Sequence, residues 1–379
     1  MKNNKSEKLL ISLLLCVILL VFMLRMTRFW GEKRINANAA QSTSEIVIDE
    51  KTKRVLFDNN ADEKRPIAST TKIVTALTVL KRARLDEVVK VSEKAVGIEG
   101  SSIYLKSGDE LTVEELLYGL MLRSGNDAAT ALAIHVGGTT ESFVKMMNEE
   151  AKKAGAKNSS FKNPHGLDVA EHYSTARDLA LITAEAFKFP AFEKIVGTKS
   201  FRREDGGTWV NKNKILSTLD GGDGVKTGYT KKAGRCLVAS ATKNGARYIS
   251  VVLNCAPMFE RSRELLNESF NVFTPKKFFA KGEELGKAEV KDCLKNKIFN
   301  FSCVEDIILP LKSGEQNAVE KFVKISKNLS LPLKKGQIIG KVDFYLGKDL
   351  IFSCKLVTIN DIEKCGFKEV VSEVAARWI

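Results

Sequence analysis

The stretch Ser69-Thr70-Thr71-Lys72-Ile73-Val74-Thr75-Ala76-Leu77-Thr78-Val79-Leu80 contains no Gly or Pro and is apolar on most faces. Such a segment is typical of a helix buried at the centre of a domain. Ser69 and Lys72 are three residues apart, so on a helix their side chains share one face. A serine hydroxyl is a weak nucleophile without an adjacent base, and a lysine becomes a base only where burial and a neighbouring positive charge lower its pKa. The stretch therefore predicts a rigidly held Ser–Lys pair inside a domain.

Helical signals continue on the C-terminal side of this stretch. The capping box over 112–115 precedes apolar residues and predicts a helix ending near Ser124-Gly125-Asn126, with a second helix from Asp127. Further helices are predicted over 143–154 and 175–187. The region from about 65 to 190 is therefore expected to be largely helical.

Strand signals flank this helical region. Residues 46–48 and 55–57 read as a hairpin, and the runs 236–241 and 248–253 are separated by a segment that holds Asn244-Gly245. Asn-Gly is the strongest short hairpin signal. Strands from both ends of the region predict an α+β fold, in which an antiparallel sheet packs against a central helical cluster.

The C-terminal part has a different pattern. After a Lys-rich segment at 276–286, short runs separated by turn signals predict a small all-β domain that extends to about residue 358. From 360 to 379, the apolar residues recur at helical spacing, which predicts a terminal amphipathic helix. These residues are Phe367, Val370, Val371, Val374 and Trp378.

The N-terminus carries an export signal. Three lysines precede an apolar run from Leu9 to Leu24, which is longer than an ordinary signal-peptide core of about 7 to 15 residues and shorter than the about 20 that span a membrane. Ala37-Asn38-Ala39 offers a cleavage site, so a cleaved signal and an uncleaved anchor both stay open. The predicted division is 1–39 signal peptide or anchor, 40–280 main domain, 281–358 β domain and 359–379 helix. The main domains are expected outside the cytoplasm, secreted or attached to the outer face of the membrane.

Composition excludes several classes of function. The chain has 60 Lys and Arg against 46 Asp and Glu, a net charge of +14, which favours an anionic partner such as a membrane surface or a wall polymer. The basic residues form no dense block interleaved with aromatics, so no nucleic-acid partner is expected. Seven scattered cysteines without a C-x-x-C pair and only three histidines predict no metal site. No nucleotide-binding glycine motif occurs, and no cofactor is expected.

Two further motifs accompany the Ser–Lys pair. Ser124-Gly125-Asn126 lies in a loop between two predicted helices, and Lys226-Thr227-Gly228 lies just before a predicted strand. S-x-x-K, S-x-N and K-T-G in this order are shared by penicillin-binding proteins and serine β-lactamases. The chain resembles the low-molecular-weight penicillin-binding proteins that are serine-type D-Ala-D-Ala carboxypeptidases. The resemblance extends to 100–102, 163–167, 173–179 and 223–229, and more weakly to the C-terminal region.

The resemblance implies a β-lactamase/transpeptidase-like fold and a role for each motif residue. Ser69 is expected to form an acyl-enzyme, Lys72 to take its proton, and Ser124 to relay a proton to the departing D-alanine. The remaining residues are expected to bind the substrate. Asn126 would contact its amide, Lys226 and Thr227 its terminal carboxylate, and Gly228 its backbone. The backbone N–H groups of Ser69 and Tyr229 would donate to its carbonyl oxygen.

The implied function is removal of the terminal D-alanine from peptidoglycan pentapeptides. β-Lactam antibiotics would acylate the same serine. A DD-endopeptidase of peptide crosslinks and a penicillin-binding sensor without turnover stay open as alternatives. A β-lactamase is disfavoured. One class of β-lactamases has a Glu in the motif E-x-x-L-N, and the nearest string here, residues 263–267, has Arg263 in place of that Glu and follows the K-T-G motif.

Overall fold

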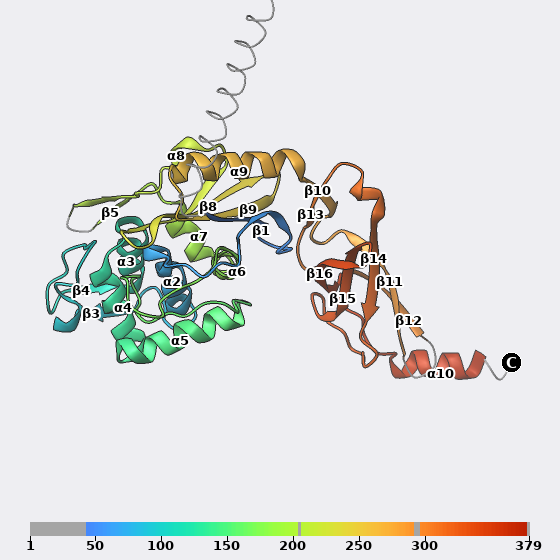
Figure 1. Ribbon diagram of the computed structural model, residues 1–379. Coiled ribbons are helices and arrows are strands. Elements are labelled where there is room, and N and C mark those ends of the chain that lie inside the picture. The colour runs from blue at the N-terminus through green and yellow to red at the C-terminus, as the bar shows by residue number, and fades with distance from the viewer. Residues whose placement is uncertain (1–42, 204–205, 292–295, 377–379) are drawn as a thin grey trace, which may run out of the picture. The chain divides into compact units, whose positions relative to one another are not determined.

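The computed structural model describes residues 43–203, 206–291 and 296–376 (Figure 1). The predicted signal or anchor segment lies outside these ranges. Among the helices within them, none has both the length and the apolar character needed to cross a membrane.

A five-stranded antiparallel sheet in the order β2-β1-β9-β8-β7 forms the centre of the first part of the chain (Figure 1). The predicted hairpin at 46–57 is present as β1 and β2, and the Asn244-Gly245 turn joins β8 to β9. Both turn residues have positive φ, 51° and 78°, as this turn type requires. The strands are β1 (Ser44–Asp49), β2 (Val55–Asn59), β7 (Gly222–Thr230), β8 (Gly234–Lys243) and β9 (Ala246–Leu253).

Both faces of this sheet are buried, because alternate residues of each strand pack into different cores. In β8, Val238 joins the core beneath the helical cluster, whereas Leu237 and Ala239 join the core beneath α9 (Met258–Val272). No helix was predicted over α9, whose buried Leu265 and Leu266 lie among many charged residues. The predicted arrangement of strands bracketing a helical cluster is confirmed, with this additional helix on the opposite face.

The helical cluster contains every helix predicted between 65 and 190. Its longer helices are α2 (Lys72–Leu80), α3 (Val113–Tyr118), α4 (Asn126–Gly137), α5 (Thr140–Lys153), α6 (Ala176–Ala186) and α7 (Pro190–Gly197). The predicted capping box is formed, since Thr112 and Glu115 exchange hydrogen bonds. Short elements absent from the predictions are β3 (Val88–Lys90), β4 (Glu110–Thr112), β5 (Ser200–Arg202), β6 (Thr208–Val210) and α8 (Ile215–Thr218).

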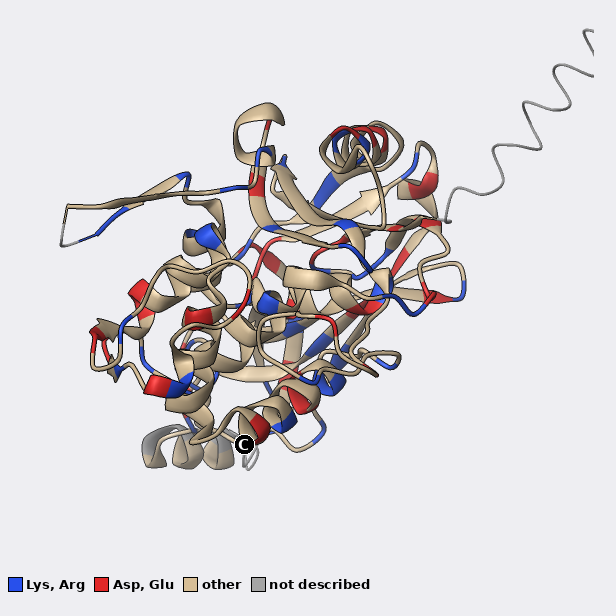
Figure 2. Ribbon diagram, turned by 60° about the vertical axis from the view of Figure 1, so that its left-hand side comes forward, with Lys and Arg blue, Asp and Glu red and all other residues tan. Residues whose placement is uncertain are grey.

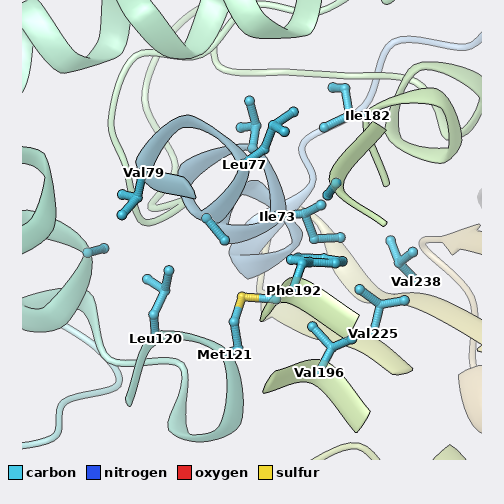
Figure 3. Packing of buried hydrophobic residues seen from close by; sticks show 14 of the residues in the cluster. Ile73, Leu77, Val79, Leu120, Met121, Ile182, Phe192, Val196, Val225 and Val238 are labelled. Atoms are coloured by element: carbon cyan, nitrogen blue, oxygen red, sulfur yellow. The ribbon is translucent and has the colours of Figure 1, made fainter. Parts of the chain in front are cut away.

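Helix α2 lies inside the cluster, as predicted from its apolar faces. Ile73, Leu77 and Val79 are fully buried. Around them pack the side chains that Figure 3 labels on neighbouring helices and on the sheet: Leu120, Met121, Ile182, Phe192, Val196, Val225 and Val238. A helix held on all sides keeps its N-terminal end in a fixed position.

The C-terminal part contains a second five-stranded antiparallel sheet, in the order β11-β12-β16-β15-β14, and a separate pair formed by β10 and β13. Its core is apolar, with Phe301, Val342 and Leu356 among the buried side chains. The strands are β10 (Thr274–Phe279), β11 (Glu284–Lys291), β12 (Asn296–Cys303), β13 (Ile307–Leu311), β14 (Val319–Ile325), β15 (Ile338–Leu346) and β16 (Asp349–Thr358). The predicted all-β character is present.

Helix α10 (Phe367–Ala376) lies within the predicted terminal helix, whose last residues are outside the described ranges. Phe367 is 83% exposed and Val371 50%, so its apolar side chains face solvent. Figure 2 shows Lys and Arg distributed with Asp and Glu over many elements. This agrees with the absence of a dense basic block in the sequence.

Candidate active site

Ser69 lies in a tight turn ahead of α2, not in its first α-helical turn as the sequence predicted. Ala68–Thr71 forms a 3-10 turn, and α2 begins at Lys72. Ala68 has a positive φ of 48°. The turn is tied by hydrogen bonds from Thr70 Oγ1 to the Ile67 carbonyl and from Thr71 Oγ1 to the Ala68 carbonyl. In a 3-10 turn residues i and i+3 eclipse, which brings Lys72 directly over Ser69.

A glycine allows the loop at 163–167 to pack against this turn. Gly166 has φ +92°, and a Cβ at this position would lie 2.0 Å from the Ala68 carbonyl oxygen. Any side chain there would displace the Ser69 turn. Residues 163–167 are part of the family resemblance, and the packing against Ala68 explains why this loop has a glycine at 166.

Lys72 is completely buried, and its amine has three neighbours. Nζ lies 2.6 Å from Asn126 Oδ1, 2.7 Å from the His165 carbonyl oxygen and 3.1 Å from Ser69 Oγ. Asn126 Nδ2 donates to the Glu99 carbonyl, which orients Oδ1 toward Lys72. A neutral amine has two N–H donors and one lone pair. Amide and carbonyl oxygens take the two donors, so the lone pair faces the Ser69 hydroxyl.

Burial and neighbouring charge favour this neutral amine. Burial lowers the pKa of Lys72 well below its usual value, and the positive charges of Lys226 and Lys212 lower it further. The three hydrogen-bonding neighbours of Lys72 are uncharged, and the charge of Asp127 opposes the shift only in part. Lys72 thus meets both conditions that make a lysine a base beside a serine.

Lys226 is the second buried lysine. Its Nζ donates to the Thr227 carbonyl at 2.9 Å, and its side chain is 2% exposed. Burial, with the charge of Lys212, lowers the pKa of Lys226 to about 7. Near neutral pH a fraction of Lys226 therefore carries the charge that depresses Lys72 and that can bind an anion.

Lys226, Thr227 and Gly228 lie inside β7, which corrects the prediction that this motif comes just before a strand. β7 is at the end of the sheet order, and a Cβ on Gly228 would lie 3.1 Å from Ile67 O, Ser69 N and Thr70 N. The motif strand thus runs directly along the nucleophile turn. The Tyr229 ring is 62% exposed, and the Arg235 guanidinium lies over it at 5.6 Å.

Ser124 and Asn126 come from the connection between α3 and α4. A π-helical turn at Gly119–Arg123 follows α3, and Ser124 then adopts the left-handed conformation with φ 66°. Ser124 is buried, and Asn126 begins α4. The second predicted motif is therefore held at a helix junction, with Asn126 in contact with Lys72.

Sequence reasoning missed two contributors around the site. Lys212 lies close enough to lower the pKa of both buried lysines. Asp127 accepts hydrogen bonds from Ser102 Oγ and from the backbone N–H groups of Ile103 and Leu105, which fixes the 101–105 loop beside Asn126. Only the position of Asp127 next to S-x-N offered a signal; Lys212 has none in the sequence.

The ring of His165 is held by the backbone of its own loop and does not contact Lys72. Burial lowers the pKa of the His165 ring to about 3, so the ring is neutral at pH 7. Its Nδ1 accepts from the Leu167 N–H at 3.3 Å. It is the backbone carbonyl of His165 that contacts Lys72. Within the described ranges, no group of three or more His, Cys, Asp or Glu side chains could hold a metal ion.

Comparison with known proteins identifies the family. The model of the D-alanyl-D-alanine carboxypeptidase family of S11 peptidases matches residues 32–256, and that of the penicillin-binding protein 5 C-terminal domain matches 273–364. The chain belongs to the D-alanyl-D-alanine carboxypeptidase family. It is similar to carboxypeptidase DacF of Bacillus subtilis, with 34% identity over 98% of this chain and 99% of that one. With DacC of Escherichia coli it shares 35% identity, over 92% and 90% of the two chains.

Solved structures agree with this assignment. Penicillin-binding protein 5 of Haemophilus influenzae matches 85% of this chain and 97% of its own, with 32% identity and a TM-score of 0.65. The predicted transpeptidase/β-lactamase-like fold followed by an all-β domain is confirmed. The carboxypeptidase is a serine peptidase of a peptidoglycan-acting, penicillin-binding family, and its role is extracytoplasmic.

Proposed function

We propose that Ser69 is the nucleophile of this carboxypeptidase and Lys72 its general base. The Lys72 lone pair takes the Ser69 proton as Oγ attacks the carbonyl carbon of the penultimate D-alanine. The observation that carries this proposal is the environment of Lys72 Nζ, which is buried, surrounded by uncharged partners and 3.1 Å from Ser69 Oγ. Collapse of the tetrahedral intermediate leaves an acyl-enzyme on Ser69, which water then hydrolyses.

Ser124 relays a proton to the departing amine of the terminal D-alanine. Its position two residues before Asn126 supports this role, because Asn126 Oδ1 is in direct contact with Lys72. Asn126 also binds the substrate amide. Ser124 is buried and is held in the left-handed conformation at a helix junction.

The edge of β7 and the nucleophile turn form the substrate side of the site. The backbone N–H groups of Ser69 and Tyr229 donate to the developing oxyanion, and each such donor is worth about 10²-fold or more in rate. Lys226 and Thr227 bind the terminal carboxylate. The close approach of Gly228 to Ser69 N supports this arrangement, because a side chain at this position would crowd the backbone of the turn.

The substrate class is the D-Ala-D-Ala end of peptidoglycan stem pentapeptides, and β-lactams acylate Ser69. The test is release of free D-alanine from a diacetyl-Lys-D-Ala-D-Ala peptide by wild type and by Ser69→Ala. Release that vanishes in the variant supports the proposal. If neither protein releases D-alanine while labelled penicillin still attaches to Ser69, the proposal is overturned in favour of an endopeptidase, tested on crosslinked muropeptides, or a sensor.

We propose that the N-terminal segment exports the protein, either as a cleaved signal or as an anchor. The tail then attaches the protein to the outer face of the cell membrane. The functional division is 40–280 for catalysis, 281–358 for the β domain and 359–379 for the tail helix. The exposed Phe367 and Val371 on α10 support the tail's role. Cosedimentation of the chain from residue 40 with anionic vesicles tests it; Phe367→Asp should reduce binding, and equal binding would contradict it.

A further inference from the structure

Two buried cysteines lie next to each other in the C-terminal sheet. Strands β12 and β16 are antiparallel, with Cys303 opposite Leu356. Cys354 is two residues from Leu356, so it projects from the same face of the sheet as Cys303. The two side chains are 1% and 2% exposed and belong to one apolar core. The two thiols lie close enough to influence each other's pKa, and both are free in this structure.

The backbone after Cys303 keeps the two sulfur atoms together. The Val304 N–H donates to the Lys355 carbonyl at 3.2 Å, so the pairing of β12 with β16 continues for one residue beyond Cys303. The Cys354 thiol donates to the Lys355 carbonyl at 3.4 Å. The Cys303 thiol, followed by the nearby backbone N–H groups of Val304 and Glu305, lowers the pKa of Cys354, whereas the pKa of Cys303 is raised. Of the two, Cys354 is therefore the one whose thiolate, the form that attacks disulfides, is favoured.

A second pair of buried cysteines shows what an arrangement unsuited to bonding looks like. Cys236 belongs to the core beneath the helical cluster, where its thiol donates to the Ala233 carbonyl at 3.7 Å. Cys255 belongs to the core beneath α9, where its thiol donates to Glu45 Oε1 at 3.9 Å. Although Cys255 N bonds to the residue before Cys236, the two thiols pack in different cores, and burial raises the pKa of both to about 11.

We propose that Cys303 and Cys354 form a disulfide that links β12 to β16 in the exported protein. An extracytoplasmic location permits it, since disulfides persist outside the reducing cytoplasm. The oxidant is a protein or small-molecule disulfide. The Cys354 thiolate attacks it to give a mixed disulfide and one released thiol, and Cys303 then attacks the Cys354 sulfur. One S–S bond forms, two S–H bonds break, and the oxidant leaves as a dithiol with the two electrons and protons.

The bond would constrain the β domain without touching the catalytic site. The link joins residues about 50 apart in sequence, and loops of that size stabilise by restricting the unfolded chain. The reduced and oxidised forms should therefore differ in the unfolding of the β domain, with a Tm higher by roughly 10 °C in the oxidised form. Both forms should release D-alanine at the same rate.

The test uses the full chain produced by an export-competent host and trapped with an alkylating agent during lysis. Denaturation, digestion and mass spectrometry should then give the Cys303 and Cys354 peptides as one linked species, two hydrogens lighter than the sum, with Cys236 and Cys255 fully alkylated. Cys303→Ser should leave Cys354 alkylated. Cys255→Ser, the matched control, should leave the link intact.

A second sample of wild type is unfolded, reduced and refolded in a glutathione redox buffer, so that access to the buried pair cannot limit the result. Labelling of Ser69 by penicillin selects correctly folded protein. Alkylated Cys303 and Cys354 in both samples would overturn the proposal, as would a link from either residue to another cysteine. These outcomes are independent of D-alanine release, so they leave the proposed catalytic function unaffected.

Discussion

The two sheets of this protein bury charge in opposite ways. In the catalytic part, Lys72 and Lys226 are buried beside uncharged hydrogen-bond partners, and the positive charge of Lys226 lowers the pKa of Lys72. In the C-terminal sheet, Asp343 is 1% exposed and receives Lys324 Nζ at 2.9 Å, Lys341 Nζ at 3.0 Å and Ser353 Oγ at 2.7 Å. Its pKa is lowered to about 2, despite burial, by these partners.

This difference separates reactive from structural charge. A buried group with compensating partners stays ionised and holds elements together, whereas a buried amine without a carboxylate is driven toward its neutral, basic form. Replacing a buried charge that has compensating partners should lower stability, and replacing the unpaired buried amine should lower activity.

Replacing Lys72 should have the largest effect. Lys72→Met removes the base and should lower D-alanine release by about 10³-fold, while thermal stability should stay equal or rise because an unpaired buried amine is replaced by an apolar chain. Release assays and calorimetry on the same preparation check both effects. If the variant unfolds at a much lower temperature, the Lys72 amine stabilises the fold, and the distinction between reactive and structural buried charge fails.

Filling the gap between β7 and the nucleophile turn should have the next largest effect. Gly228→Ala places a Cβ 3.1 Å from three backbone atoms of the turn, and a displacement of this kind at a reacting serine should slow penicillin acylation by about 10- to 10²-fold. Stopped-flow acylation measures it. Gly366→Ala, where an added Cβ meets nothing within 4 Å, is the control, and equal rates in both variants would contradict the prediction.

The pH profile should report the coupling of the two lysines. In wild type, kcat/KM rises with pH as Lys72 loses its proton and falls above about pH 7 as Lys226 loses the charge that binds the substrate carboxylate. Because Lys226 lowers the pKa of Lys72, Lys226→Gln should move the acid limb to higher pH and abolish the alkaline limb. An unmoved acid limb would show that burial alone sets the pKa of Lys72.

Replacing Asp343 should have the smallest effect on catalysis. Asp343→Ala leaves Lys324, Lys341 and Ser353 without their shared acceptor and should destabilise the β domain by about 1 to 3 kcal/mol, with kcat/KM unchanged. Urea unfolding of the full chain measures the change. Asp343→Asn keeps an acceptor for Ser353 and should lie between wild type and Ala. A loss of D-alanine release in either variant would place this cluster in the catalytic machinery.

Local signals account for most of the elements that the sequence predicted. The capping box at Thr112 and the Asn244-Gly245 turn depend on side-chain and backbone contacts within a few residues, and both are present as predicted. Helix α9 was missed because its apolar residues are few, and only packing against the far face of the sheet makes it a buried helix.

The family, the order of the three motifs and the bracketing of helices by strands could be predicted from the chain alone, because these follow from residue identity and periodicity. The tertiary structure decided the state of Lys72. Its lowered pKa depends on burial and on Lys226 from β7, and the position of its amine depends on Asn126 from α4 and on the His165 carbonyl from a loop. The same holds for Cys303 and Cys354, which strand register brings together. Proton affinity and thiol proximity depend on distances between residues far apart in the chain, and those distances exist only after folding.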